Sequence, residues 1–300
     1  MAKILVTGGT GLIGNALVPL LLKSGHEVVL LSRNPSNNKV PTYQWDIDSM
    51  TIDHKAFTGI DSIIHLAGAG IADKPWTKAR KQEIIDSRVK SAELLKNTCE
   101  ELGLKLKSFI SASAIGWYPL IISDKEFTEE DDPGKGYLSE VCKLWEESAD
   151  SFDGVAEHIA KVRIGLVLCK QGGALPQMSL PVKLYVGSPI GNGKQAMPWI
   201  HVKDISRVFI HILENKLSGV YNGVGPENAT NEEFMQTIAD VLDRPMILPK
   251  VPEFIIKLLF GGKADLITKG VKVSSKKLKA SDFTYNYPTL NTALTDIYFG

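Results

Sequence analysis

Hydrophobic and polar positions follow two different patterns along the first half of the chain. Short apolar runs predict strands at residues 3–7, 26–32, 61–67, 107–113 and 156–168. Between them, longer amphipathic stretches with the period of a helix cover residues 12–23, 78–101 and 138–150. Strands that alternate with helices favour parallel pairing, so the pattern predicts an α/β fold with a doubly wound parallel sheet.

The second half of the chain has a different pattern. Glycine and proline become frequent between residues 172 and 198, and helices are predicted at 202–215, 231–242 and 253–259. We therefore expect one domain over residues 1–170 and a smaller C-terminal α/β lobe over residues 171–300. Open α/β sheets bind ligands at the carboxyl ends of their strands, so this lobe is expected to contribute the substrate side.

A glycine-rich turn, Thr7-Gly8-Gly9-Thr10-Gly11-Leu12-Ile13-Gly14, connects the first predicted strand to the first predicted helix. Gly8 allows the tight exit from the strand, Gly11 lets a pyrophosphate approach the backbone, and Gly14 lets the helix pack against the sheet. The amides at the helix start then face the phosphates. A tight turn without a ligand is the alternative. The context favours a Rossmann-like domain whose dinucleotide contacts Gly8, Thr10, Gly11, Leu12 and Ile13.

The end of the second predicted strand bears on which dinucleotide binds. An NAD site usually has an acidic residue about 20 residues after the glycines, where it bonds the ribose 2′-hydroxyl. This chain has Leu30-Leu31-Ser32-Arg33-Asn34 there, with no carboxylate. Arg33 can bond a 2′-phosphate with two charge-assisted hydrogen bonds, and Ser32 can add a hydroxyl donor. The alternative is a solvated loop arginine. The sequence favours NADP over NAD.

Charge and cysteine content narrow the function classes further. The 300 residues carry 34 basic and 34 acidic side chains, which argues against nucleic acid as a partner. Three widely spaced cysteines without a Cys-x-x-Cys pair, and histidines without ligand spacing, argue against disulfides and a metal site. No secretory signal or bilayer-length apolar stretch is visible, so we expect a soluble, cytoplasmic protein that binds a small-molecule substrate as a monomer or homodimer.

The residues resemble the extended short-chain dehydrogenase/reductase superfamily. The Thr7-Gly8-x-x-Gly11-x-x-Gly14 spacing is its fingerprint, and His65-Leu66-Ala67-Gly68 resembles its turn that lines the cofactor cleft. Asp46 resembles the acidic residue that members place near the adenine. Further motifs are similar to a branch labelled nucleoside-diphosphate-sugar epimerase or cell-division inhibitor homologue, and they include Trp76-Thr77, Gly116-Trp117-Tyr118 and Pro198-Trp199-Ile200-His201. The resemblance covers the whole chain and implies a C-terminal module of unknown function over residues 249–296.

The superfamily's catalytic residues are only partly present. The resemblance implies a serine at Ser113 and a tyrosine at Tyr137, but the residue four positions after Tyr137, where lysine belongs, is Val141. If Trp145-Glu146 sets the register instead, the pair becomes Leu138 and Cys142. Tyr118 is a substitute acid or a packed aromatic. Where the superfamily commonly has an asparagine, this chain has Ser87-Arg88, and Arg88 reaches a phosphate or acidic substrate or forms a surface ion pair.

Two functions remain open from the sequence. The first is an NADP-dependent epimerase, dehydratase or reductase that acts on a small polar substrate such as a nucleotide-linked sugar. The second is a non-catalytic NADP-binding sensor or regulatory protein, which the incomplete Tyr-Lys pair favours. A protein that binds no cofactor is the weakest interpretation, because the glycine spacing and Arg33 would then be coincidence.

Overall fold

The computed structural model describes residues 1–35 and 40–300, and it divides into two compact units. Unit 1 contains Met1–Ala114, Glu140–Arg163 and Ser206–Tyr221; unit 2 contains Ile115–Ser139, Ile164–Ile205 and Asn222–Gly300. Each unit is thus assembled from several separate segments of the chain. The boundary expected at residue 170 remains a prediction.

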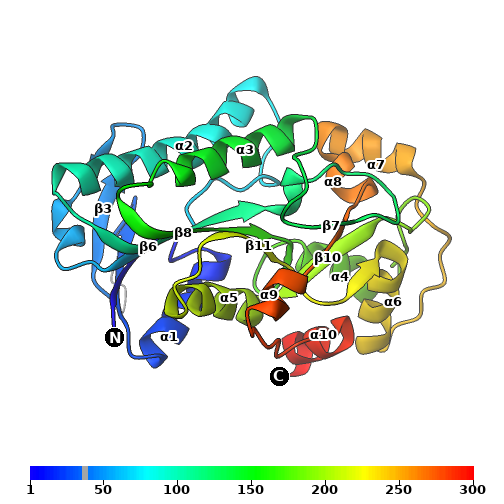
Figure 1. Ribbon diagram of the computed structural model, residues 1–300. Helices are drawn as coiled ribbons and strands as arrows, with labels where there is room; N and C mark the ends of the chain where they lie inside the picture. The colour runs from blue at the N-terminus through cyan, green and yellow to red at the C-terminus, as the bar shows by residue number, and fades with distance from the viewer. Residues whose placement is uncertain (36–39) are drawn as a thin grey trace. The chain divides into compact units, whose positions relative to one another are not determined.

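Unit 1 is built on an eight-stranded sheet in the order β11-β8-β6-β5-β1-β2-β3-β4 (Figure 1). The central strands β6, β5, β1, β2 and β3 pair in parallel, and β4 pairs antiparallel to β3 at the edge. The order of strands reverses at the boundary between β1 and β5, which is where doubly wound sheets bind dinucleotides. The strands are β1 (Lys3–Thr7), β2 (Glu27–Ser32), β3 (Thr42–Asp46), β4 (Thr51–Ile52), β5 (Ser62–His65), β6 (Leu106–Ala114), β8 (Ala156–Ile164) and β11 (Gly219–Gly223).

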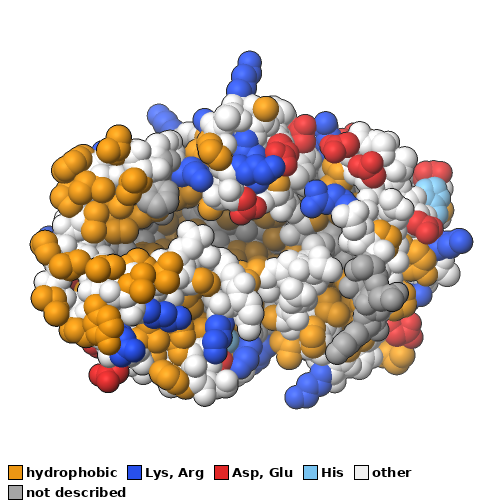
Figure 2. Space-filling view, turned by 180° about the vertical axis from the view of Figure 1, so that it is seen from behind, with side chains coloured by type: hydrophobic (Ala, Val, Ile, Leu, Met, Phe, Trp, Pro, Cys, Tyr) orange, Lys and Arg blue, Asp and Glu red, His pale blue; other side chains and the backbone are white. Residues whose placement is uncertain are grey.

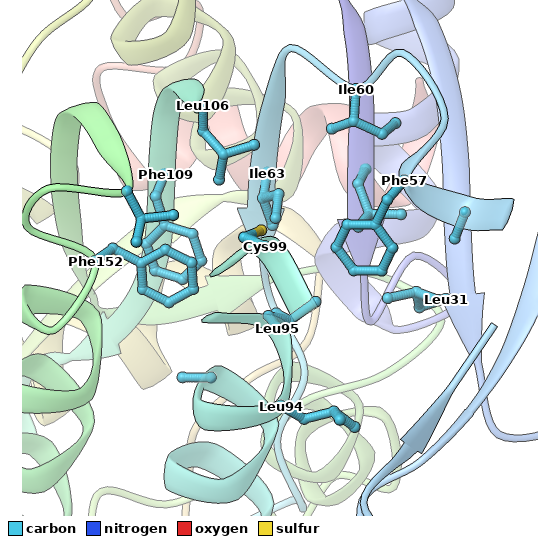
Figure 3. Close-up of a cluster of buried hydrophobic side chains, with 14 of the residues drawn as sticks. Leu31, Phe57, Ile60, Ile63, Leu94, Leu95, Cys99, Leu106, Phe109 and Phe152 are labelled. Atoms are coloured by element: carbon cyan, nitrogen blue, oxygen red, sulfur yellow. The ribbon is translucent and has the colours of Figure 1, made fainter. Parts of the chain in front are cut away.

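Helices cover both faces of this sheet. Figure 1 shows α2 (Lys78–Glu101) and α3 (Tyr137–Asp150) on one face and α1 (Leu12–Lys23) and α5 (Val202–Glu214) on the other. The core under α2 is apolar, and Figure 3 shows Leu94, Leu95 and Cys99 of α2 facing strand residues such as Ile63 and Phe109. The rings of Phe109 and Phe152 stack with their centroids 3.6 Å apart. Apolar side chains at helical spacing thus fix α2 on the sheet.

The predicted α/β class and parallel sheet are confirmed, and the bounds predicted for β1, α1 and α2 match the structure. The single strand predicted over residues 156–168 is wrong. It divides at Gly165 into β8 and β9 (Leu166–Leu168), and β9 pairs with β10 in another sheet. A Cβ atom on Gly165 would lie 2.6 Å from the carbonyl oxygen of Pro198, so the bend depends on glycine.

Unit 2 contains two small sheets surrounded by short helices. One has the strand order β12-β10-β9 and the other pairs β13 with β7 in parallel. Its elements are β7 (Glu126–Phe127), α4 (Leu175–Lys183), β10 (Ala196–His201), β12 (Asn228–Thr230), α6 (Asn231–Val241), α7 (Glu253–Phe260), α8 (Asp265–Thr268), β13 (Lys272–Val273), α9 (Lys276–Ala280) and α10 (Leu290–Phe299). Helices α4 and α10 were not predicted from the sequence; α4 has prolines at its start and inside it.

Exposed apolar side chains are more frequent in unit 2 than in unit 1. Phe254, Leu258 and Leu259 of α7 are exposed, as are Ile247 and Leu248 before it. Figure 2 shows several clusters of hydrophobic side chains on one face of the molecule, with lysine and arginine between them. Surfaces of this kind are typical of ligand or partner contacts. Within the described residues, no helix is long and apolar enough to cross a membrane.

Candidate functional site

The turn between β1 and α1 leaves no room for side chains at its glycines. Gly8 has a φ of +69°, and a Cβ atom there would lie 2.9 Å from the backbone of Leu66. A Cβ atom on Gly14 would lie 2.3 Å from the carbonyl oxygen of Gly8. Gly11 is the N-cap of α1 and no side chain caps the helix, so its first amides face outward. This cradle fits a pyrophosphate at the helix start.

The turn after β5 lies against the glycine turn. Thr7 ends β1, and its Oγ1 accepts hydrogen bonds from the amides of Leu66 and Ala67, each at 3.2 Å. The same hydroxyl lies 2.7 Å from Nδ1 of His65, whose Nε2 lies 3.0 Å from the hydroxyl of Ser91. Burial lowers the pKa of His65 to about 4, so its ring is neutral at neutral pH. The predicted residues Leu66, Ala67 and Gly68 therefore adjoin Gly8 in one unit.

The adenine end of the predicted cofactor site is an open recess. It has a volume of about 430 Å³ and is lined by Arg33, Asn34, Gln44, Trp45 and Asp46. Arg33 is exposed, which suits it to an incoming phosphate. Asp46 accepts hydrogen bonds from Ser49 Oγ at 2.8 Å and from the amide of Asp48 at 2.9 Å, and these bonds lower its pKa. The structure thus brings Arg33 and Asp46 together.

Ser32 makes a local turn next to this recess. Its hydroxyl donates to the carbonyl oxygen of Asn34 at 3.2 Å and accepts from the amide of Asn34 at 3.3 Å. These two bonds fix the direction in which the backbone leaves β2, and Arg33 lies between the two residues. Ser32 therefore holds the position of Arg33, and its contact with a phosphate remains a prediction.

Ser113 is part of a buried polar network. Its hydroxyl donates a 2.7 Å hydrogen bond to Oε1 of Glu146, and Arg163 donates to the same carboxylate from Nε at 2.8 Å and Nη2 at 3.0 Å. All three side chains are at most 4 % exposed. The hydroxyl proton of Ser113 is engaged with the carboxylate, and its oxygen keeps acceptor capacity. Glu146 entered the sequence-based interpretation only through the register of its helix, and no local pattern indicated this network.

Helix α3 carries no lysine at either candidate position. Tyr137 is the first residue of α3 and is half-buried, and Val141, four residues later, is buried. Cys142 is buried as well, with its thiol 3.5 Å from the carbonyl oxygen of Ala114, and burial raises its pKa to about 12. The lysine of α3, Lys143, is exposed and pairs with Glu147. A neutral thiol and a valine therefore occupy the two places where an ammonium group was considered.

Arg88 lies in the interior of unit 1, not on its surface. It is buried on α2, and Nη1 donates to the carbonyl oxygens of Ala69 at 3.1 Å and Ile84 at 2.9 Å. Its guanidinium carbon lies 4.5 Å from the ring centroid of Trp145 on α3. A Cβ atom on Gly68 would lie 3.1 Å from the same guanidinium carbon. The expectation of a surface ion pair is wrong, because the guanidinium packs beneath the turn that follows β5.

Several other singled-out residues have structural roles in unit 2. Tyr118 is fully buried and donates a 2.7 Å hydrogen bond to Oδ1 of Asn222, which argues against a role as substitute acid. His201 stacks on Tyr287 with centroids 3.9 Å apart, and Asp204 accepts from the amides of residues 286 and 287. Trp199 is core. Among the residues described, no cluster of three or more His, Cys, Asp or Glu side chains is placed to hold a metal.

Comparisons with known proteins agree with the fold described above. Residues 4–143 match the model of the NAD dependent epimerase/dehydratase family, and residues 251–297 match a domain of unknown function. The human epimerase family protein SDR39U1 is 34% identical, and the alignment covers 98% of this chain and 99% of that protein. The Bacillus subtilis epimerase family protein YfhF is 35% identical, with 98% and 97% covered.

Solved structures show the same fold. The human SDR39U1 structure with NADPH has a TM-score of 0.87 at 33% identity, with 98% of both chains covered. A UDP-N-acetylglucosamine 4-epimerase from Bacillus cereus has a TM-score of 0.74 at 20% identity, with 99% of this chain and 96% of that chain covered, and shares the fold. Family match, whole-length relatives and fold lead to one conclusion. The chain belongs to the NAD dependent epimerase/dehydratase family, in the group of epimerase family proteins that carry the C-terminal domain of unknown function.

Proposed function

We propose that the protein is an NADP(H)-dependent enzyme of the epimerase, dehydratase or reductase type that acts on a small polar substrate such as a nucleotide-linked sugar. The observation that carries this proposal is the cradle between β1 and α1, where Cβ atoms on Gly8 or Gly14 would collide with backbone. Arg33 at the end of β2 supports NADP over NAD. The human relative was crystallised with NADPH, which is consistent with this preference.

Different residues of unit 1 would bind different parts of the cofactor. The outward amides of α1 would hold the pyrophosphate, and Arg33 would bond the 2′-phosphate. A nicotinamide cofactor supplies hydride transfer, and the protein supplies position and proton transfer. Ser113 offers an oxygen lone pair for a substrate hydroxyl, since its own proton is bonded to Glu146. Tyr137 is the proposed proton donor, without a lysine four residues later to lower its pKa.

Ligand-dependent unfolding tests the cofactor, and turnover tests the enzyme. A ligand at about a hundred times its Kd stabilises by roughly 2.7 kcal/mol, which raises the Tm by about 2–4 °C. We expect this shift with NADP(H) and a smaller one with NAD(H). A screen of sugar nucleotides, aldehydes and ketones that follows NADPH absorbance should then show turnover, and Tyr137→Phe should reduce it. A Tyr137→Phe variant with full turnover would remove Tyr137 from the mechanism.

A non-catalytic NADP(H)-binding sensor is the second candidate. The observation that favours it is the buried face of α3, where Val141 and the neutral thiol of Cys142 replace the ammonium group that activates a tyrosine. A sensor should bind NADP(H) with the thermal shift given above and show no turnover with any member of the substrate screen. Turnover with one substrate class would exclude it.

We also keep the cytoplasm as the proposed location. Cys99, Cys142 and Cys169 are all free and buried, which is typical of proteins that work in a reducing compartment. A fusion to a fluorescent protein, imaged in the source cell, should be distributed through the cytoplasm. Enrichment in another compartment would contradict this part of the proposal.

A further inference from the structure

One wall of the recess is formed by β3, whose side chains alternate between two environments. Tyr43 and Trp45 pack in the apolar core cluster of unit 1. Gln44 lies between them and is exposed, because successive side chains of a strand point to opposite faces of the sheet. Gln44 lines the same recess as Arg33. An amide from β3 and the guanidinium group that follows β2 thus face one cavity.

The backbone of Gln44 is held by two neighbours. It pairs in parallel register with Ser32, the last residue of β2 and the residue before Arg33. Its carbonyl oxygen accepts a 3.0 Å hydrogen bond from the amide of Asp53. Neighbouring strands lie about 4.8 Å apart, so a glutamine side chain on β3 is long enough to reach a group bound at the end of β2.

The ionisable groups that line the recess balance each other. Arg33 supplies one positive charge, and Asp46 supplies one negative charge because hydrogen bonds, first that from Ser49, lower its pKa. Glu83 of α2 has its pKa lowered by a hydrogen bond from Arg80, 2.7 Å away, and the charge of Arg33 adds to this shift. A phosphate in the recess would therefore gain from a neutral donor and would be repelled by a further carboxylate.

We propose that Gln44 is a second residue that selects NADP(H) over NAD(H), because its side-chain amide donates a hydrogen bond to the 2′-phosphate that Arg33 holds. This inference rests on the proposed NADP(H) binding and applies equally to an enzyme and to a sensor. An N–H bond to a phosphate is charge-assisted, whereas the ribose of NAD(H) offers only a hydroxyl at that place. Recognition of the phosphate thus extends from the end of β2 to β3.

The first variant removes only the donor. Gln44→Met keeps the length of the side chain without its amide, and calorimetry gives its Kd for NADPH and for NADH. The affinity for NADPH should fall about fivefold, which is the net value of one such hydrogen bond, and the affinity for NADH should stay at the wild-type value. An unchanged Kd for NADPH would overturn the inference. Equal weakening of both would overturn it too, because it would indicate a contact with the base or ribose.

The second variant adds a charge at the same place. Gln44→Glu should lower the affinity for NADPH by more than about tenfold through repulsion, and it should leave NADH bound at least as tightly as in wild type, because a carboxylate can accept from the ribose 2′-hydroxyl. The preference for NADPH should therefore disappear. If Gln44→Glu keeps the wild-type preference, the 2′-phosphate does not lie beside Gln44 and the inference is wrong.

Asn97→Asp is the matched control for charge. Asn97 is also an exposed amide of unit 1, and it lies in the last two turns of α2. Because α2 follows β5 and runs back along the sheet, its carboxyl end lies at the edge opposite the carboxyl ends of the parallel strands. Asn97→Asp should leave both Kd values unchanged. If it weakens NADPH as much as Gln44→Glu does, net charge causes the effect and the assignment to Gln44 fails.

The result for wild type separates this inference from the proposed function. If wild type binds neither NADPH nor NADH, the proposed function fails and the inference fails with it. If wild type prefers NADPH and Gln44→Met keeps the full preference, the proposed function stands and only the inference fails. Because Gln44 is exposed, its variants should fold and unfold in urea as wild type does.

Two fragments of the cofactor confine the test to the recess. Adenosine 2′,5′-bisphosphate carries the 2′-phosphate, adenosine 5′-monophosphate lacks it, and each can be titrated in competition with NADPH. Gln44→Met should weaken the bisphosphate about fivefold and leave the monophosphate unchanged. An equal effect on the two fragments, or no effect on either, would overturn the inference.

Discussion

The two regions of unit 1 that flank the proposed cofactor site use arginine in different ways. At the end of β2, Arg33 is exposed beside an open recess. After β5, Arg88 is buried, and α2, the turn at Ala69 and the indole of Trp145 on α3 fix its guanidinium. An exposed residue at the end of a strand can thus be proposed from local sequence, whereas the position of a buried arginine depends on tertiary contacts.

Burial also sets how strongly each end should respond to mutation. A charge in water is screened and its removal disturbs little beyond the ligand, whereas a buried charge held by several groups supports the local structure. Effects at the recess should therefore appear mainly in affinity. Effects around the turn after β5 and the network at Ser113 should appear in stability as well.

The largest effect is expected at the buried ion pair. Arg163→Met leaves the buried carboxylate of Glu146 without its paired guanidinium, so the free energy of unfolding should fall by about 3–5 kcal/mol. Lys250→Met is the control, because Lys250 pairs with Glu232 and their side chains are 42% and 51% exposed, so the loss should be about 0–1 kcal/mol. Urea unfolding of both variants measures this, and equal losses would contradict the role of burial.

Acid should destabilise the turn after β5. The pKa of His65 is about 4 when folded and about 6.5 when unfolded, so the unfolded chain binds the proton more readily. Its contribution, at most about 3 kcal/mol, is complete above pH 6.5 and is lost as the pH falls towards 4. Burial lowers the pKa of His201 to about 4 too, so protonation of His201 should also reduce the stability of unit 2 in acid.

Measuring the free energy of unfolding in urea at pH 7 and at pH 5 tests this dependence of stability on pH. His65→Gln should flatten the dependence of stability on pH, and the exposed His54→Gln should leave it unchanged. A slope that is the same in both variants would show that His65 does not cause the acid sensitivity.

Alanine substitutions at two glycines should separate the effect of backbone strain from the effect of a steric collision. Gly8 and Gly25 both have positive φ, at +69° and +82°, so alanine at either position is strained by roughly 1–2 kcal/mol. Only at Gly8 does the Cβ atom meet backbone, 2.9 Å from Leu66, whereas nothing lies within 4 Å at Gly25. Gly8→Ala should lose NADPH binding and Gly25→Ala should keep it, as calorimetry would measure. Retained binding in Gly8→Ala would contradict the cradle.

The sequence predicted what depends on local pattern. The spacing of apolar positions defines α1 and α2, and the glycine spacing predicts the turn between β1 and α1, because these features involve neighbouring residues. The network of Ser113, Glu146 and Arg163 joins residues 17 and 33 positions apart, and no local pattern contains it. The break at Gly165 likewise depends on a carbonyl 33 residues away. Tyr137 as proton donor remains a prediction.

The most direct test of the account is a calorimetric titration of wild type and Arg33→Gln with NADPH and NADH. A charge-assisted bond from Arg33 to the 2′-phosphate is worth about 1.5–3 kcal/mol, so wild type should bind NADPH at least about tenfold more tightly than NADH. Arg33→Gln should bind the two with nearly equal affinity, and its binding of NADH should not change. Wild-type protein that binds NADH as tightly as NADPH, or binds neither, would contradict the account.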